Sequence, residues 1–316
     1  MKTYIFSFLI CFGMIFGTTS CSSDDNSPTD DQQQTDDSTD DSTDDTTDDS
    51  NDDGSQGLAA EVLPNVSYGD DLQQVYDIYL PEGRTSDKTK TIVLIHGGGW
   101  VEGDKEDMAG YVTLLQANHP DHAVVNLNYR LAVVPNTPAF PQQFYDVRDA
   151  LAHLTAESDN FQINPTFGFI GVSAGAHLSM QYDYVYDTTD QVKFVCDVVG
   201  PTDFTDPFYA DDPEYQIYLD FLVDESEYPG VTDYATEVSP ALRVSAASSP
   251  TIMFYGNEDP LVPLTNGNTL DAKLSESGVT HSYTVYNGGH GDWDAISYID
   301  LQSQLSVFIE THLPID

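Results

Sequence analysis

The feature that most constrains the fold is a serine set between two glycines directly after a short apolar run. The apolar run Phe167–Val172 predicts a buried strand, and a helical pattern follows over residues 176–181. Between them lies Gly171-Val172-Ser173-Ala174-Gly175, a G-x-S-x-G motif in a strand–turn–helix context. So tight a turn forces strained backbone angles on the serine and requires small residues two positions before and after it. Its hydroxyl would then project beside a helix N-terminus, which favours negative charge. The motif also arises by chance in Gly- and Ser-rich loops, so the remaining chain must decide its meaning.

Strand-like and helix-like patterns alternate along residues 58–316, which we expect to form one α/β domain. Strands are predicted at 66–68, 75–80, 91–95, 123–131, 167–172, 193–199, 250–255 and 281–286, and helices at 142–156, 176–181, 265–277 and 295–312. This alternation predicts a mainly parallel central sheet flanked by helices and joined by right-handed crossovers. A long aromatic and acidic insertion, about 204–245, follows the sixth strand. It is expected to lie over the C-terminal edge of the sheet as a lid or substrate wall, or to bury its aromatic residues in a small core of its own.

Two further residues follow predicted strands in the order that nucleophilic acyl transfer would need. The chemistry requires a hydroxyl, a base that takes its proton and a carboxylate that orients the base. Ser173, Asp259 and His290 occur in this order, and loops at the C-terminal ends of parallel strands meet at one edge of the sheet. Glu258 and Asp203 are alternative acids. His177 and His281 are rival bases, and we expect both of these histidines to be structural.

A glycine-rich loop follows the predicted strand at 91–95. Its sequence is His96-Gly97-Gly98-Gly99-Trp100. Consecutive glycines expose backbone N–H groups, which can stabilise an oxyanion. A phosphate-binding loop is the alternative, but no Lys-Ser/Thr pair follows the glycines. His96 is either a base or a residue that orders the loop through hydrogen bonds, and the second role is favoured.

These motifs together resemble the hormone-sensitive-lipase-like and feruloyl-esterase-like (BD-FAE) serine esterases of the α/β-hydrolase fold. The resemblance rests on five segments in order: His96–Trp100, Asn128-Tyr129-Arg130-Leu131, residues 171–178, the Asp259 loop and His290. It implies that Ser173 is the nucleophile, His290 the general base and Asp259 its partner. It also implies that the N–H groups of Gly98, Gly99 and Ala174 form an oxyanion hole. No metal and no cofactor is expected, and the substrate would be a small-molecule or polysaccharide-linked ester.

The balance of charge excludes some partners. With 53 Asp and Glu against 10 Lys and Arg, the formal net charge is -43. Nucleic acid and anionic membrane surfaces need Lys and Arg in numbers, so neither is an expected partner. So acidic a domain repels itself at low ionic strength. We therefore hypothesise that the protein works in a salty medium.

The first residues predict export and lipid anchoring. Lys2 and the apolar run at 4–16 are typical of a signal peptide, expected over 1–20, and the run is too short for a transmembrane helix. Small residues precede Cys21, which resembles the lipidated cysteine of bacterial lipoproteins. Multiple acyl chains there would give stable membrane anchoring, whereas ordinary cleavage would release the protein. The acidic residues after Cys21 resemble an export signal for the outer-membrane surface, with periplasmic or secreted locations as alternatives.

The segment from 21 to 57 predicts a disordered, Asp-rich tether after the cysteine. Its repeats of Asp with Ser and Thr contain almost nothing apolar, so they cannot form a core. Calcium binding is the alternative for so many carboxylates, but no EF-hand spacing is present. The last cysteine, Cys196, lies in an apolar run and is expected to be a buried strand residue.

These observations predict a surface-anchored serine carboxylesterase that forms an acyl-enzyme intermediate. Acetyl or feruloyl groups on polysaccharide are the expected substrates, because display on a tether suits polymers too large to import. A peptidase or aryl-formamidase on the same fold is one alternative. A catalytically silent binding module is the other.

Overall fold

The computed structural model describes residues 57–315. The expected signal peptide, the lipidation site Cys21 and the tether up to residue 56 lie outside the described residues. The described strands are β1 Glu61–Ser67, β2 Val75–Leu80, β3 Thr91–Ile95, β4 Ala123–Leu127, β5 Phe167–Val172, β6 Val192–Val198, β7 Thr251–Gly256 and β8 His281–Tyr286. They form an 8-stranded sheet in the order β1-β2-β4-β3-β5-β6-β7-β8. β2 pairs antiparallel with β1 and β4, and every other pair is parallel.

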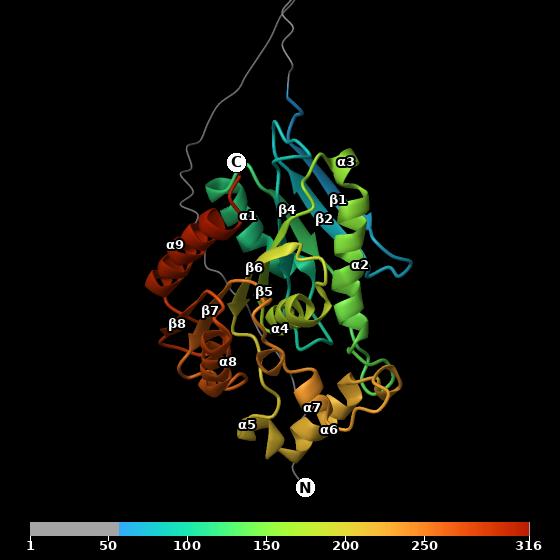
Figure 1. The fold of residues 1–316 in the computed structure, drawn as a ribbon, viewed down its shortest axis with the longest axis vertical. Coiled ribbons are helices and arrows are strands. Elements are labelled where there is room, and N and C mark those ends of the chain that lie inside the picture. Colours follow the sequence, from blue (N-terminus) through green and yellow to red (C-terminus); the bar gives the residue numbers. More distant parts are fainter. Residues whose placement is uncertain (1–56, 316) are drawn as a thin grey trace, which may run out of the picture. The chain divides into compact units, whose positions relative to one another are not determined.

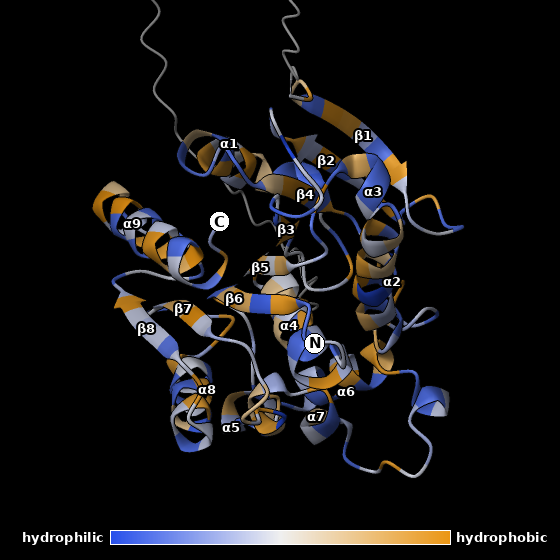
Figure 2. Ribbon diagram, turned by 45° about the horizontal axis from the view of Figure 1, so that its top comes forward, coloured by the Kyte–Doolittle hydropathy of each residue, from blue (hydrophilic) through white to orange (hydrophobic). Residues whose placement is uncertain are grey.

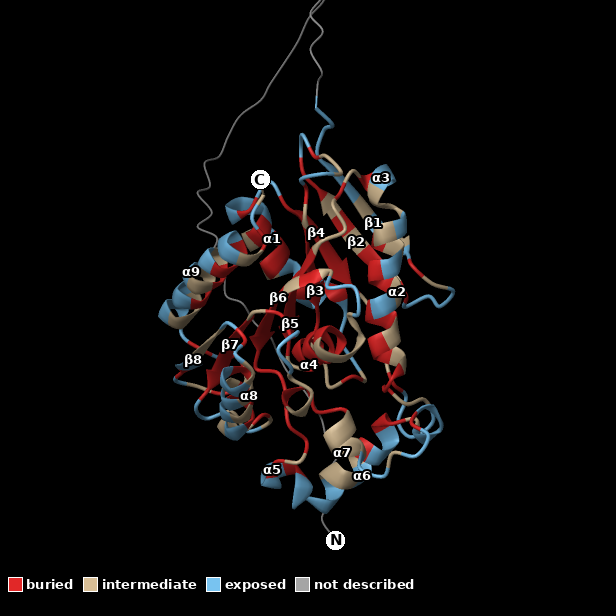
Figure 3. Ribbon diagram, in the orientation of Figure 1, coloured by how far each residue is buried: buried red, intermediate tan, exposed pale blue. Residues whose placement is uncertain are grey.

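Helices cover both faces of this sheet (Figure 1). The α-helices that flank the strands are α1 Ala109–Asn118, α2 Gln142–Ala156, α3 Ser158–Phe161, α4 Ala174–Gln181, α8 Leu264–Ser277 and α9 Ala295–His312. A π-helical turn, Tyr182–Tyr186, continues α4. α1 and α9 bury apolar residues in one core layer, and α2, α4 and α8 contribute to the other. Because both faces are covered, every residue of β3, β4 and β5 is buried, as the dark red centre of Figure 3 shows. Such strands are mostly apolar rather than alternating, with Thr91 and Asn126 as buried polar residues of β3 and β4.

The insertion after β6 folds into short helices at one end of the domain. These are α5 Pro207–Ala210, α6 Pro213–Leu222 and α7 Tyr234–Glu237, with short 3-10 turns Glu225–Glu227 before α7 and Pro240–Leu242 after it. Phe204, Tyr209, Leu219 and Leu222 of this region are buried in the core layer that α2 and α4 share. The insertion therefore has no separate core, and its aromatic residues extend the main one.

Most predicted elements are confirmed, including both ends of α2 and of α9. The predicted strand at 123–131 was too long. β4 ends at Leu127. The Asn128 N–H still donates to the Val75 carbonyl oxygen of β2, but the N–H groups further along donate to side chains instead of to a neighbouring strand. The Arg130 N–H, for example, donates to Asp146 Oδ2. The first strand was predicted too short, since β1 begins at Glu61 and continues through a bulge between Leu63 and Val66.

Two elements after β3 were not predicted. A 3-10 turn, Lys105–Met108, leads into α1, and Asp104 caps the turn by accepting from the Glu106 N–H. The sequence of α1 has no clear apolar periodicity, although Tyr111, Val112 and Leu115 are buried. α9, which carries both apolar and polar residues (Figure 2), is easier to recognise, because its buried residues Leu301, Leu305, Phe308 and Ile309 recur at helical spacing. Between residues 57 and 315 no helix has both the length and the apolar character to cross a membrane.

Candidate active site

Ser173 occupies a strained turn between β5 and α4. Its φ of 54° and ψ of -119° lie in a region that non-glycine residues rarely adopt. The Ser173 N–H is held by the Val198 carbonyl oxygen at 2.8 Å. A Cβ on Gly175 would stand 2.1 Å from the Ile95 carbonyl oxygen, and one on Gly171 would stand 2.5 Å from the Ala176 nitrogen. The two motif glycines therefore allow the close packing that fixes the serine in this conformation.

His290 and Asp259 complete a hydrogen-bonded chain that begins at Ser173. His290 Nε2 lies 2.8 Å from Ser173 Oγ, and His290 Nδ1 lies 2.7 Å from Asp259 Oδ2. Asp259 Oδ1 accepts from the N–H groups of Leu261 at 2.8 Å and Val262 at 3.0 Å. The Asp259 side chain is 0% exposed and the His290 side chain 8%. Residues 117 and 31 positions apart in the sequence are thus brought together at the C-terminal edge of the sheet.

The rival acids and bases lie elsewhere. Glu258 is exposed, and Asp203 accepts from Thr205, the residue two positions after it. His281 bonds to the Val279 carbonyl oxygen and to Asp271. His177 is buried, and burial lowers the pKa of its imidazole to about 4. Asp203, His281 and His177 thus have partners other than Ser173, and the Glu258 side chain faces solvent.

The glycine-rich loop lies against Ser173 and depends on its glycines. A Cβ on Gly97 would approach Ser173 Cβ at 3.2 Å, and one on Gly98 would stand 1.9 Å from the Glu102 carbonyl oxygen. Gly98 and Gly99 have φ values of 114° and 55°, and Trp100 shares this left-handed conformation at 68°. Among residues 57–315, the N–H groups of Gly98, Gly99 and Ala174 donate to no protein acceptor. They are therefore available to a bound anion or carbonyl.

His96 orders the base of this loop, as the sequence suggested. It is buried, and its Nδ1 lies 2.7 Å from the Gly97 carbonyl oxygen. Its ring stacks on Tyr129 with centroids 4.4 Å apart, and the Tyr129 hydroxyl donates to the His96 carbonyl oxygen. Burial lowers the pKa of the His96 imidazole, so the ring is neutral near pH 7.

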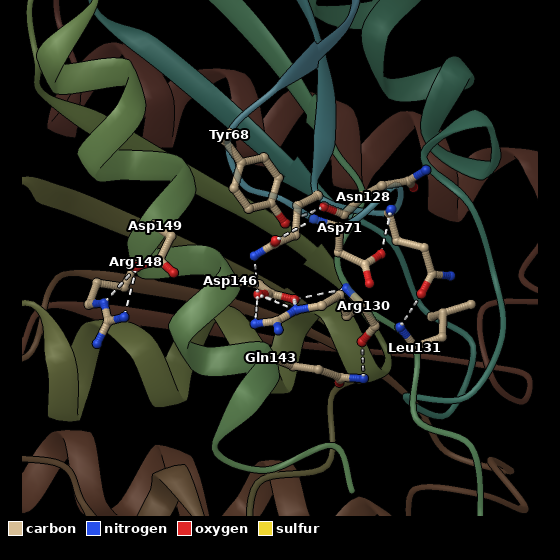
Figure 4. Close-up of polar contacts among 11 residues, drawn as sticks. Tyr68, Asp71, Asn128, Arg130, Leu131, Gln143, Asp146, Arg148 and Asp149 are labelled. Carbon is tan, nitrogen blue, oxygen red and sulfur yellow. Dashed lines mark hydrogen bonds and ion pairs between the residues drawn. The ribbon is translucent and has the colours of Figure 1, made fainter. Parts of the chain in front are cut away.

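Polar side chains of α2 bind the segment that follows β4 (Figure 4), and one of them, Gln143, also binds the glycine-rich loop. The Arg130 guanidinium donates to both oxygens of Asp146, whose side chain is 0% exposed. Burial raises the pKa of the Asp146 carboxyl, and the Arg130 hydrogen bonds oppose this effect. Gln143 Nε2 donates at 2.8 Å to the carbonyl oxygens of both Trp100 and Arg130. The segment after β4 and the glycine-rich loop are thereby fixed to one helix.

Sequence reasoning missed the pairing of Trp100 with His177. The Trp100 indole N–H donates to His177 Nδ1 at 3.2 Å, and His177 Nε2 lies 2.8 Å from the Val238 carbonyl oxygen. A neutral ring with its proton on Nε2 satisfies both contacts. One signal for this pairing was present in the sequence: Trp100 lies in the glycine-rich motif and His177 in the serine motif, and neither residue has a catalytic role there.

Cys196 is a buried free thiol in β6, which confirms the prediction of a buried strand residue. Burial raises the pKa of this thiol. Cys21 lies outside the described residues. In residues 57–315 no group of three or more His, Cys, Asp or Glu side chains is arranged to hold a metal ion.

The strand order, the crossovers and the serine turn define the α/β-hydrolase fold. The family model BD-FAE matches residues 76–274, and the chain belongs to this family.

The curated relatives include two enzymes. Esterase LipC of Mycobacterium tuberculosis is 24% identical over 242 residues, which is 72% of this chain and 59% of LipC. Arylacetamide deacetylase of Oryctolagus cuniculus is 35% identical over 107 residues, covering 32% of this chain and 26% of that protein. The chain thus spans less than two thirds of the length of each of these relatives.

Solved structures share the fold. A truncated carbohydrate esterase from gut microbiota superimposes with a TM-score of 0.63 at 21% identity, over 79% of this chain and 97% of that one. The thermophilic esterase Est2 of Thermogutta terrifontis gives 0.64 at 17% identity, over 81% and 94%.

Proposed function

We propose that the protein is a serine carboxylesterase that hydrolyses esters through an acyl-enzyme intermediate. One observation carries this proposal: Ser173 Oγ, His290 and Asp259 form a continuous hydrogen-bonded chain at 2.8 and 2.7 Å. Family membership and the esterase names of LipC and Est2 support it. In the proposed roles Ser173 is the nucleophile, His290 the general base and then acid, and Asp259 the residue that orients His290.

In the first half-reaction, Ser173 Oγ attacks the acyl carbon as His290 Nε2 takes its proton. The carbonyl π-electrons move to oxygen, and the N–H groups of Gly98, Gly99 and Ala174 donate to this oxyanion. Collapse expels the alcohol oxygen, which takes the proton from His290. Asp259 accepts from His290 Nδ1 throughout, so it stabilises the imidazolium and maintains the tautomer.

In the second half-reaction, water replaces the alcohol. His290 Nε2 takes a proton from this water as the water oxygen attacks the acyl carbon. The second tetrahedral intermediate uses the same three N–H groups. Its collapse releases the carboxylic acid, and the proton on His290 returns to Ser173 Oγ. Acid and alcohol are the products, and the enzyme is regenerated.

For the substrate, we propose acetyl or feruloyl esters of polysaccharide. The support is the carbohydrate-esterase title of one structural neighbour, together with the export features of the sequence. The acidic insertion favours neutral over anionic polymers, because its carboxylates repel negative charge.

The test is hydrolysis of p-nitrophenyl esters from acetyl to decanoyl by the purified protein and by Ser173→Ala. We expect activity greatest at acetyl and reduced at least about 10⁴-fold in the variant. Release of acetate from acetylated xylan would extend the result to polysaccharide. A peak at long acyl chains would replace the carbohydrate substrate with lipid-like esters. No hydrolysis of any ester would overturn the esterase proposal and favour an amidase or a binding module.

For localisation, we propose that residues 1–20 are removed and that Cys21 is lipidated, anchoring the protein to the outer membrane. The small residues before Cys21 and the acidic residues after it support this. Mass spectrometry of the N-terminal peptide should show acyl chains on Cys21, and Cys21→Ala should move the protein from the membrane to the soluble fraction. An unmodified N-terminus at another residue would contradict the anchor.

A further inference from the structure

Two tyrosine hydroxyls of the insertion donate hydrogen bonds to loops of the candidate site, one to the glycine-rich loop and one to the loop that carries Asp259. Tyr218 lies on α6 and Tyr209 on α5, within the group of short helices at one end of the domain (Figure 1). We infer that these two tyrosines are positioning residues, which fix the glycine-rich loop and the Asp259 loop in the geometry that the reaction needs. The inference rests on the proposed esterase function and goes beyond it, because it gives the insertion a part in catalysis.

Tyr218 acts on the glycine-rich loop. Its hydroxyl donates to the Gly99 carbonyl oxygen at 2.8 Å, across 119 positions of sequence. Glycine restrains its own backbone less than any other residue, so three in a row would otherwise sample many conformations. The next carbonyl oxygen, that of Trp100, accepts from Gln143 and from the Ala132 N–H. The loop is therefore held by the insertion at Gly99 and by the α2 side at Trp100, which leaves its N–H groups in one orientation.

Tyr209 acts on the loop that carries Asp259. Its hydroxyl donates to the Leu261 carbonyl oxygen at 3.1 Å, and the Leu261 N–H donates to Asp259 Oδ1 at 2.8 Å. Leu261 is thus held through both of its backbone polar groups. The second Asp259 oxygen faces His290, so a shift of Leu261 would move the carboxylate away from the imidazole.

The two contacts belong to one aromatic cluster. The Tyr215 ring stacks on Tyr209 with centroids 4.4 Å apart and lies 6.3 Å from Tyr218. Phe204 packs 5.8 Å from Tyr209 and 5.9 Å from Trp100. Because aromatic rings in such contact move little relative to one another, displacement of one loop is resisted by the other.

The experiment compares Tyr218→Phe and Tyr209→Phe in the full protein, since each change removes only a hydroxyl. We expect kcat for p-nitrophenyl acetate to fall about ten-fold in each variant with KM within about two-fold, because the loss acts on the transition state. Tyr234→Phe is the matched control, because Tyr234 lies in the same insertion and its hydroxyl has no partner among residues 57–315. The assays are run well below the melting temperature of every variant.

Amide hydrogen exchange provides a readout that does not depend on activity. We expect faster exchange over residues 97–103 in Tyr218→Phe and over 259–263 in Tyr209→Phe, with no change in Tyr234→Phe. Unchanged exchange, or faster exchange with undiminished kcat, would overturn the inference. If the wild-type protein hydrolyses no ester, the esterase proposal fails by itself. Exchange alone then decides whether the tyrosines fix the loops.

Discussion

At the scale of single residues, the backbone conformation that places the Ser173 hydroxyl is expected to destabilise the folded protein. A φ of 54° is unfavourable for any residue with a Cβ, and glycine adopts it without that cost. Ser173→Gly should therefore be more stable than Ser173→Ala by about 1 kcal/mol, although both lose the hydroxyl. Urea unfolding followed by circular dichroism measures the difference. Equal midpoints for the two variants would show that the turn stores no strain.

His177 is a second residue whose burial has a measurable consequence. Its pKa of about 4 lies below the ordinary value of 6.5, so the unfolded chain binds a proton between these values while the folded chain does not. Stability that His177 contributes near neutral pH is therefore lost as the pH falls, by up to about 3 kcal/mol at pH 4. Two buried carboxyls, Asp183 and Asp197, act in the opposite sense, because burial raises the pKa of each to about 7.

A comparison of wild type with His177→Gln separates these effects, since the carboxyls are the same in both proteins. Glutamine can still accept from Trp100 and donate to Val238 but does not titrate. We expect wild type to be the more stable protein at pH 7, and this advantage should shrink steadily between pH 6.5 and 4. Urea unfolding at several pH values measures it. An advantage that stays constant across this range would mean that His177 binds its proton equally well in the folded and unfolded states.

At the scale of secondary-structure elements, one ion pair joins α2 to the segment that follows β4. Arg130 binds Asp146 through both carboxylate oxygens, and a lysine could not reproduce this geometry. Arg130→Lys should cost about 2–3 kcal/mol of unfolding free energy because the Asp146 carboxylate is fully buried. Arg148→Lys is the matched control, because Arg148 lies on α2, the helix that carries Asp146. Its pair with Asp149 is half exposed, so the change should cost under about 0.5 kcal/mol. Similar losses in both variants would contradict a special role for the buried pair.

The elements also show what the sequence could predict. Strands such as β3 and β5 are almost entirely apolar, and the buried residues of α2 and α9 recur at helical spacing, so local pattern was sufficient for them. α1 was missed because apolar residues off its buried face, such as Ala109 and Leu114, obscure the helical spacing of Tyr111, Val112 and Leu115. The predicted end of β4 lay too far along the chain, because the Arg130 N–H donates to the distant carboxylate of Asp146 and not to a neighbouring strand.

The candidate site likewise contains features that the sequence predicted and features that it did not. Chain order and strand ends predicted that Ser173, Asp259 and His290 meet, since parallel strands bring their C-terminal loops to one edge. Contacts such as Trp100 with His177, or Tyr218 with Gly99, join loops through packing that no local pattern encodes. Sequence therefore indicated the reacting groups but not the residues that hold them in place.

At the scale of the whole molecule, the excess of acidic residues dominates the electrostatics. Seven Lys and Arg side chains among residues 57–315 already pair with a carboxylate: Arg84, Lys105, Arg130, Arg148, Lys193, Arg243 and Lys273. Residues 57–315 hold many more Asp and Glu than Lys and Arg, so most carboxylates in this part of the chain have no cationic partner within it. Their mutual repulsion opposes the compact state, in which they lie closest together.

Salt should therefore stabilise the folded protein. The Debye length falls from about 30 Å at 0.01 M to about 8 Å at 0.15 M, so repulsion between separated surface charges is largely screened by this point. We expect Tm to rise by several degrees between about 0.01 and 0.2 M NaCl and more slowly above that, where only closely spaced charges remain to be screened. Sucrose at matched osmolality is the control, because it stabilises by exclusion from the surface without screening charge. A Tm highest in salt-free buffer, or an equal rise in sucrose, would show that charge repulsion does not limit stability and would remove the basis for a salty working medium.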